Sequence, residues 1–247
     1  MKLLDLTLPA PAENLACDEA LLDWCEDGAG EQVLRFWESR QYFIVVGYAN
    51  KVASEVNATA CRTNGIPVYR RCSGGGTVVQ GPGCLDYSIV LKITEDGPLR
   101  SITSANRFIM ERNRVAIESL CPGSRTSNAR PHIAVRGHTD LCLDDLKFSG
   151  NSQRRRKHFL MFHGTFLLKF DLSLVSEVLR MPSRQPDYRK ERAHASFLTN
   201  LNMPAKSVKA AMKRAWDANS PLNDPPLERT AILVRDKYAS PAWNHRL

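Results

Sequence analysis

The sequence lacks any apolar run that approaches the roughly 20 residues of a membrane-spanning helix. Its longest candidate, residues 43–47, has the length of a buried strand. The N-terminal residues reach Asp5 and Pro9 too early for a secretory signal. Internal repeats and low-complexity tracts are missing as well. We therefore expect a soluble, cytoplasmic protein that binds no membrane.

Paired cysteine motifs are also lacking. The seven cysteines form no CxxC pair and their number is odd. Without an export signal, such cysteines are expected to be reduced thiols rather than disulfides or zinc ligands. They stand at positions 17, 25, 61, 72, 84, 121 and 142.

Acidic residues are outnumbered. The chain has 34 Lys and Arg against 26 Asp and Glu, a formal net charge of +8. This balance suits an anionic partner, either a nucleotide, a nucleic acid, a membrane surface or an acidic protein. Part of the positive charge is the basic cluster at residues 154–157. This cluster can equally be the solvated tip of a hairpin that binds no partner. Because no zinc finger, RNP sequence or basic zipper is present, we expect no nucleic-acid partner.

What the chain does contain is ordinary globular composition: 247 residues, 43% hydrophobic and 24% charged. The length fits a single domain over residues 1–247, with residues 173–247 as its helical and loop part. Helices and strands mix without regular βαβ alternation, which predicts an α+β fold. The expected helices are 14–26, 52–64, 103–120 and 206–217, and the expected strands are 33–37, 43–47, 68–71, 87–93, 232–234 and a meander over 139–171 with a hairpin turn at Asp144-Asp145.

The densest chemical signal is a glycine triplet, residues 74–76, preceded by Arg70 and Arg71. Consecutive glycines allow close backbone approach to a ligand, and their N–H groups can converge on phosphate oxygens. Neighbouring arginines can add charge-assisted hydrogen bonds. The segment has neither a P-loop lysine nor the dinucleotide-binding spacing. A glycine-rich turn with solvated arginines is the alternative.

Two further segments carry polar residues inside expected strands. Lys147 stands between Leu146 and Phe148, so strand alternation places it on the face opposite to theirs. His163 precedes Gly164 in an apolar strand, a pattern that can mark close approach of a ligand. A solvent-facing lysine and a satisfied, half-buried histidine are the ordinary alternatives.

Taken together and in order, these segments resemble the lipoate–protein ligase family, part of a wider group of biotin and lipoate ligases and octanoyltransferases. The resemblance begins at residues 14–21 and passes through Val46-Gly47. It then runs through the glycine segment, residues 147–154 and residues 163–165, and it closes at residues 237–244.

The resemblance implies a fold like class II aminoacyl-tRNA synthetases and biotin–lipoate ligases, with mixed sheets flanked by helices. It also implies an ATP-dependent ligase. Lipoate would react with ATP, with Mg2+ present, to give lipoyl-adenylate. A lysine of an acceptor lipoyl-domain protein would then take the lipoyl group and release AMP.

The resemblance also implies site residues. Lys147 is the catalytic residue, an electrophilic clamp on the acyl carbonyl and α-phosphate. Asp140 lies near magnesium, with a turn aspartate as the alternative. The residues implied to bind ATP or lipoyl-adenylate are Arg70, Ser73, Gly74, Gly75, Gly76, Thr77, Val79, Asp140, Lys147, Ser149 and Gly150. Those implied to form the lipoyl pocket are Val46, Gly47, Arg71, His163, Gly164 and Thr165.

Some positions depart from the ligase pattern. Gln80-Gly81 replaces His-Asp, Cys84 stands where Asn is frequent, and Thr139 stands where Asn is usual. We expect this chain to lack the additional small C-terminal domain of many ligases, which would then be dispensable or supplied as a separate polypeptide, unless the acyl donor is already activated.

Two alternatives to the ligase therefore stay open. One is an octanoyl or lipoyl transferase that moves the acyl group between carrier proteins through a cysteine thioester. It requires a nucleophilic thiol beside Lys147, for which Cys72, Cys84 and Cys142 are the candidates. The other is a basic binding module without catalytic activity.

Overall fold

The computed structural model describes residues 1–121 and 132–247. Within these residues, eight strands form a mixed sheet in the order β11-β1-β2-β6-β10-β9-β8-β7, and three form a small sheet in the order β4-β3-β5. The large sheet consists of β1 (Lys2–Asp5), β2 (Val33–Trp37), β6 (Cys84–Lys92), β7 (Ile133–Arg136), β8 (Asp140–Leu143), β9 (Leu146–Arg155), β10 (Phe159–Leu167) and β11 (Ser220–Pro221), and the small sheet of β3 (Phe43–Val46), β4 (Val68–Arg70) and β5 (Val78–Gln80).

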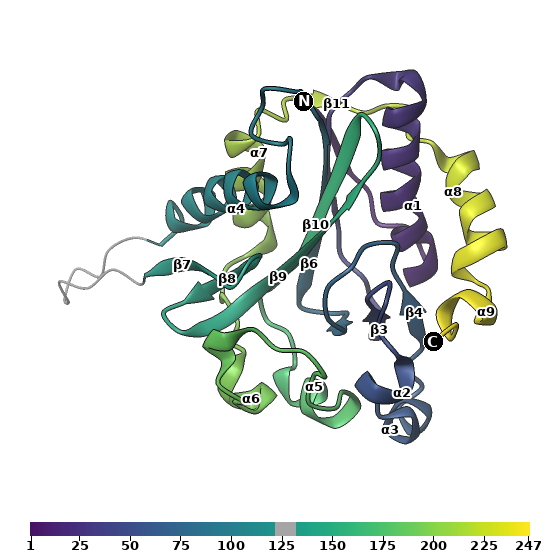
Figure 1. The fold of residues 1–247 in the computed structure, drawn as a ribbon, viewed down its shortest axis with the longest axis vertical. Coiled ribbons are helices and arrows are strands. Elements are labelled where there is room, and N and C mark those ends of the chain that lie inside the picture. Colours follow the sequence, from purple (N-terminus) through teal and green to yellow (C-terminus); the bar gives the residue numbers. More distant parts are fainter. Residues whose placement is uncertain (122–131) are drawn as a thin grey trace.

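Helices cover both faces of the large sheet (Figure 1). They are α1 (Pro11–Trp24), α2 (Val52–Glu55), α3 (Ala58–Thr63), α4 (Ile102–Glu118), α5 (Leu172–Val178), α6 (His194–Phe197), α7 (Ala205–Ala215), α8 (Leu227–Leu233) and α9 (Pro241–Asn244). α4 and α7 lie on one side of the sheet, and α1 lies on the other with α8 outside it. The mixed sheets flanked by helices confirm the predicted α+β fold.

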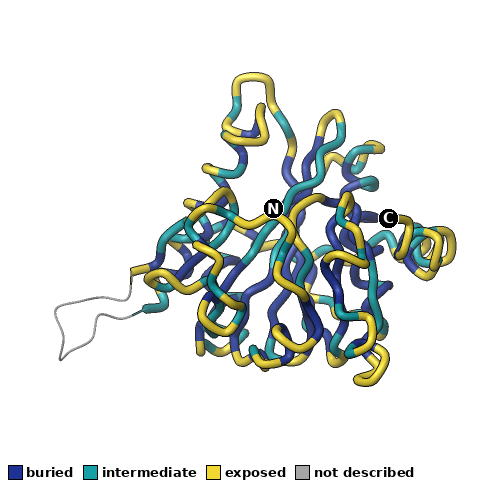
Figure 2. The backbone as a smooth tube through the Cα atoms, turned by 60° about the horizontal axis from the view of Figure 1, so that its bottom comes forward, coloured by how far each residue is buried: buried dark blue, intermediate teal, exposed yellow. Residues whose placement is uncertain are grey.

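The two faces of the large sheet differ in polarity. On β6, Leu85, Tyr87 and Ile89 belong to the main apolar core, together with residues of α4 and α7. The alternate residues Asp86 and Ser88 are buried on the opposite face, because side chains of a strand alternate between faces. Figure 2 shows buried residues gathered in the middle of the molecule and exposed residues around its outside. The polar face is the one that carries the candidate site.

Helix α1 is buried on nearly all sides, since it lies between the sheet and α8. Its polar residues Asn14, Asp18 and Glu19 are as buried as its leucines. Buried charges need partners. Glu19 accepts hydrogen bonds from Lys237 and Tyr238 of the C-terminal part of the chain, which anchors that part against α1.

Most of the expected elements are confirmed, within one to three residues. The helix expected at 103–120 spans Ile102–Glu118, and Ser101 caps it by accepting a hydrogen bond from the Ser104 N–H. The hairpin with the Asp144-Asp145 turn joins β8 and β9, and Asp144 adopts a φ of 53°.

Two expected elements are wrong. The helix expected over 52–64 is divided in two, because Val56 is extended and bridges to Leu179, and Asn57 then caps a new helix. The strand expected at 232–234 is instead helical: it forms the end of α8 and the first residue of a π-helix, Val234–Tyr238. Its short apolar run, Leu233 and Val234, packs against the cluster around Tyr238, and so short a run does not distinguish strand from helix.

In the part of the chain that the structure describes, no helix is both long enough and apolar enough to cross a membrane.

Candidate functional site

A cavity of about 1040 Å3 lies on the polar face of the large sheet, at the upper end of the usual range for ligand pockets. Its walls are the strands β6, β9 and β10, the glycine segment at residues 75–77, and residues 179–198 between β10 and α7.

Sheet register assembles one wall of this cavity from five strands. Trp37 pairs with Asp86, Asp86 with Thr165, Thr165 with Gly150, and Gly150 with Asp140. Directly opposed residues share a face, and all five line the cavity. With strands about 4.8 Å apart, the row extends over roughly 19 Å. We call it the cross-strand row.

Lys147 and Asp140 form an ion pair at one end of the cross-strand row. Lys147 Nζ lies 2.8 Å from Asp140 Oδ1, and the Tyr188 hydroxyl donates to Asp140 Oδ2 at 2.7 Å. Both charged side chains are largely buried but reach the cavity. Burial and the Asp140 charge raise the pKa of Tyr188, so its hydroxyl stays protonated and donates. The arrangement holds a cation and a carboxylate side by side in a shielded site.

A β-bulge directs Lys147 into the cavity. Leu141 is opposite Ser149 and Cys142 is opposite Lys147, so Phe148 is an extra residue on β9. Gly150 completes the arrangement, because a Cβ there would lie 2.8 Å from Lys147 Nζ. The side chain of Lys147 therefore fills the space that glycine leaves.

His163 belongs to a buried polar network beside α1. Its Nε2 lies 2.5 Å from Ser73 Oγ, and its Nδ1 lies 3.7 Å from Asp18 Oδ2. Asp18 also accepts from Arg35 at 2.6 Å and from Ser88 at 2.8 Å. Burial raises the pKa of Asp18, but Arg35, His163 and Ser88 together outweigh it and hold that pKa below its usual value. Asp18 is thus a carboxylate that orients its neighbours.

The pKa of Asp86 is shifted in the opposite direction from that of Asp18. Asp86 is fully buried, and burial raises its pKa to about 8. Its Oδ1 accepts from Gln80 Nε2 at 2.7 Å and from Thr165 Oγ1 at 2.5 Å, whereas its Oδ2 has no hydrogen-bond partner. At neutral pH Asp86 is therefore mostly a neutral acid. Asp86 is not among the site residues predicted above, although a lone acidic residue within an apolar strand is a signal that can be read from sequence.

The two arginines beside the glycines bind backbone rather than a ligand. Arg70 is fully buried, and its guanidinium donates to the carbonyls of residues 47, 48, 50, 243 and 244. Arg71 donates to the carbonyls of residues 45, 74 and 76 and to Ser73 Oγ. Burial lowers the pKa of Arg71 to about 10, which leaves it charged. These hydrogen bonds use the guanidinium N–H groups that we expected to bind phosphate.

The predicted site residues divide into two groups. Arg70, Val46, Gly47, Ser73 and Gly74 are described by the structure but do not line the cavity; Gly47 instead packs so closely on Gly75 that a Cβ would lie 2.1 Å from the Gly75 oxygen. The predicted residues that do line the cavity are Arg71, Gly75, Gly76, Thr77, Val79, Asp140, Lys147, Ser149, Gly150, His163, Gly164 and Thr165.

Residues 179–198 also line the cavity, but none of the predicted site residues lies in this segment. This segment crosses the cavity and is fixed at its end, where the Thr199 N–H donates to the Lys147 carbonyl at 2.9 Å. It contributes Tyr188, Arg189 and Phe197 to the cavity wall. Its sequence gives no periodic pattern, so only packing places it beside Lys147.

The magnesium site expected at Asp140 does not fit these residues. Both carboxylate oxygens are engaged, one by Lys147 and one by Tyr188. Among residues 1–121 and 132–247, no three His, Cys, Asp or Glu side chains gather as metal ligands.

Solved structures of lipoate ligases share the fold. Lipoate-protein ligase A bound with ATP is 25% identical, with a TM-score of 0.80, over 99% of this chain and 98% of that one. A lipoate protein ligase from T. acidophilum with bound lipoic acid is 23% identical, with a TM-score of 0.78, over 100% and 99%.

Curated relatives point to a different reaction. The octanoyltransferase LipM of Geobacillus kaustophilus is 26% identical over 96% of this chain and 94% of that protein. LipM of Bacillus subtilis is 24% identical over 99% and 98%. These relatives overturn the expected ATP-dependent ligation. The expected ATP binding is supported only by the likeness to the ATP-bound ligase, and the names of the octanoyltransferases support neither ATP nor lipoyl-adenylate binding. Acyl transfer, the alternative reading, is the better supported one.

Residues 10–216 match the family model described as the lipoyl protein ligase A/B catalytic domain. The match covers the glycine segment, the bulged strand with Lys147 and the strand with His163. The chain therefore belongs to the lipoyl protein ligase A/B catalytic domain family.

Proposed function

We propose that this protein transfers an octanoyl or lipoyl group between carrier proteins, with a lysine of a lipoyl domain as the acceptor. The observation that carries the proposal is the Lys147–Asp140 pair inside the cavity, held by Tyr188. Relatives named octanoyltransferase LipM support the same reaction class.

The chemistry of a thioester donor suits this site. A thioester is already activated, so the site needs no phosphate-binding arginines, and Arg70 and Arg71 are committed to backbone carbonyls. What acyl transfer needs is a group that stabilises the oxyanion of the tetrahedral intermediate. We assign that role to the Lys147 ammonium, because it reaches the cavity on a bulge that fixes its direction.

The remaining cavity residues are proposed to hold the acyl group. Gly75, Gly76 and Thr77 form one part of the wall, and Gly164 and Thr165 form part of the sheet wall. Leu15, Val45 and Val78 add apolar surface near Trp37. An extended eight-carbon chain with C–C bonds of about 1.5 Å reaches roughly 9 Å, which fits within the cross-strand row.

The test is transfer from an octanoyl-carrier protein to an isolated lipoyl domain, followed by mass spectrometry of the lipoyl domain. We expect octanoyl-lipoyl domain to form, and Lys147→Ala to lower the rate by about 10²–10³-fold through loss of oxyanion stabilisation. Lys157→Ala is the matched control, because Lys157 is exposed at the far turn of the β9–β10 hairpin. Equal rates for Lys147→Ala and wild type contradict the proposal.

A further inference from the structure

The basic cluster at residues 154–157 lies outside the cavity, since none of its members is among the residues that line it. Arg155 donates to two backbone carbonyls just before α4, and Arg156 pairs with Asp23 at 2.7 Å. In the part of the chain that the structure describes, Arg154 forms no ion pair, and its Nε is buried without a hydrogen-bond partner. Two of the arginines therefore hold the fold together, and Arg154 is left for another role.

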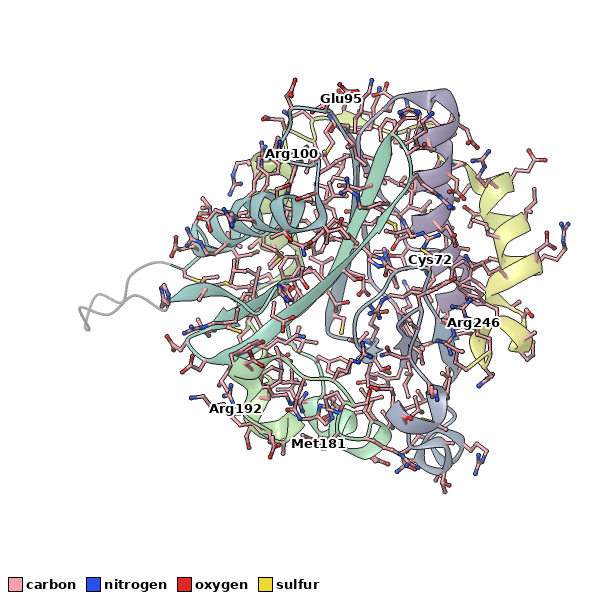
Figure 3. The ribbon with its side chains drawn as sticks, viewed as in Figure 1. Cys72, Glu95, Arg100, Met181, Arg192 and Arg246 are labelled. Atoms are coloured by element: carbon pink, nitrogen blue, oxygen red, sulfur yellow. The ribbon has the colours of Figure 1, made fainter. Side chains whose placement is uncertain are left out.

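The Arg154 guanidinium lies over an aromatic side chain at the surface. Its Cζ lies 5.8 Å from the centroid of the Tyr48 ring. Arg246, which Figure 3 labels beside α9, lies over the same ring at 3.9 Å and over the Trp243 ring at 4.5 Å. Lys237 Nζ lies 4.3 Å from the Trp243 centroid. We call these residues, Tyr48, Arg154, Lys237, Trp243 and Arg246, the cationic–aromatic surface.

Positive charge on the cationic–aromatic surface is only partly balanced. Lys237 pairs with Glu19 at 2.7 Å. Among residues 1–121 and 132–247, no carboxylate lies within ion-pair distance of Arg154 or Arg246. Arg246, and to a smaller extent Arg154, lowers the pKa of Tyr48, which is the effect of a positive potential at the phenol. Like charges held close together repel each other, and an anionic partner removes that repulsion.

The cationic–aromatic surface adjoins the opening of the cavity. The Tyr48 N–H donates to the Ser73 carbonyl at 2.8 Å. Ser152, on β9 beside the arginine of this surface, donates from Oγ to the Gly74 carbonyl at 2.9 Å. Residues 75–76, which follow directly, are exposed and also line the cavity, so they lie where the cavity meets solvent. A partner bound to the cationic–aromatic surface is therefore separated from the cavity only by the glycine segment.

The residue types of this surface are those of a protein interface. Tyrosine, tryptophan and arginine are the residues enriched at the energetic centres of protein–protein contacts. The Tyr48 side chain is 38% exposed, and Arg246 is exposed as well. None of the five residues lines the cavity. The surface therefore suits an acidic macromolecule docked outside the cavity rather than a small ligand within it.

The length of a lysine side chain favours the acceptor over the donor as this macromolecule. With bonds of about 1.5 Å, a lysine side chain extends roughly 6 Å beyond its Cα. A folded domain that presents its lysine to the cavity must therefore dock beside the opening. A donor thioester on a long flexible arm carries no such requirement.

We propose that the cationic–aromatic surface binds an acidic face of the acceptor lipoyl domain and so directs the acceptor lysine past the glycine segment into the cavity. The identity of the acceptor rests on the proposed function. Arg154 and Arg246 meet carboxylates of the domain, and Tyr48 and Trp243 supply contact area. Such complementary charges guide the encounter of two proteins, and salt weakens their attraction.

Isothermal titration calorimetry of the protein with an isolated, unmodified lipoyl domain tests the docking without any turnover. We expect the double variant Arg154→Gln, Arg246→Gln to bind about tenfold more weakly than wild type at low ionic strength, and the difference to shrink at high ionic strength. Arg214→Gln is the matched control, because Arg214 is exposed on α7, on the other side of the large sheet.

A charge-preserving double variant, Arg154→Lys with Arg246→Lys, separates charge from any structural effect of the arginines. It should recover most of the lost affinity, and circular dichroism verifies that each variant is folded. Equal affinities of wild type and the glutamine variant overturn the proposal. Loss of binding to the octanoyl-carrier donor or to a DNA duplex, with lipoyl-domain binding unchanged, overturns it as well.

Initial rates of transfer distinguish this docking from the proposed function. In the glutamine variant, we expect the KM for the lipoyl domain to rise by about tenfold, with kcat and the KM for the donor unchanged. Wild-type protein that binds the lipoyl domain through these arginines but forms no acylated product contradicts the proposed function alone. Normal product formation with an unchanged KM in the variant overturns the docking alone.

Discussion

Lys147 and Gly150 face the same cavity although they are three residues apart on one strand. Regular alternation would place them on opposite faces. The extra residue Phe148 shifts the register between β8 and β9 and reverses the alternation. The side chain of Lys147 then occupies the space that Gly150 leaves because it has no side chain.

This relationship predicts that Gly150→Ala lowers transfer activity by about 10²-fold, because a displacement of about 1 Å at a reacting group has that effect. The new Cβ would lie 2.8 Å from Lys147 Nζ and 2.9 Å from Cε. Gly74→Ala is the control, since a Cβ there meets nothing within 4 Å. Transfer rates, with circular dichroism to verify folding, measure the effect. Equal loss in both variants would show that the Lys147 contact is not the cause.

Asp86 predicts a specific dependence of stability on pH. Its pKa is about 8 in the folded protein and about 4 when unfolded. The unfolded state therefore binds fewer protons between these values, and stability falls as pH rises through that window. Asp86→Asn keeps the acceptor for Gln80 and Thr165 but cannot ionise. We expect urea unfolding to show that wild type loses a few kcal/mol more than Asp86→Asn between pH 5 and pH 8. Parallel pH curves for the two proteins would contradict a protonated Asp86.

Tyr188→Phe tests the third member of the Lys147–Asp140 arrangement. The variant removes the hydroxyl that donates to Asp140 Oδ2. A hydrogen bond to a charged group contributes about 1.5–3 kcal/mol, so we expect roughly tenfold slower transfer or more. Tyr42→Phe is the comparison, because the Tyr42 ring packs on Phe170 away from Asp140. A rate unchanged by Tyr188→Phe would remove Tyr188 from the site.

Arg70 is predicted to stabilise the fold rather than to bind a ligand. Arg70→Gln leaves several buried carbonyls without a donor, which we expect to lower the free energy of unfolding by about 3 kcal/mol. The folded fraction should retain its KM for the donor, measured by initial rates below the unfolding transition. Full stability with a greatly increased KM would instead support the phosphate-binding role first expected for Arg70.

Some features were determined by the sequence alone. Helical spacing within residues 103–120 and the Asp144-Asp145 turn were sufficient for a helix and a hairpin, because both are local patterns. The glycine triplet, Lys147 and His163 in their order were sufficient for the family. They did not determine the reaction, since the chain is similar to a lipoate ligase and to octanoyltransferases alike, and the expected ligase was wrong.

Tertiary structure decided the rest. The guanidinium groups of Arg70 and Arg71 point toward backbone carbonyls of strand β3, helix α9 and the glycine segment, which are brought together only by the fold. Tyr188 reaches Asp140 from a segment without any periodic pattern. Asp86 keeps its proton because neighbouring strands bury it. Sequence patterns report local periodicity, whereas the direction of a donor, the register of a bulged strand and the protonation of a buried acid depend on residues far away along the chain.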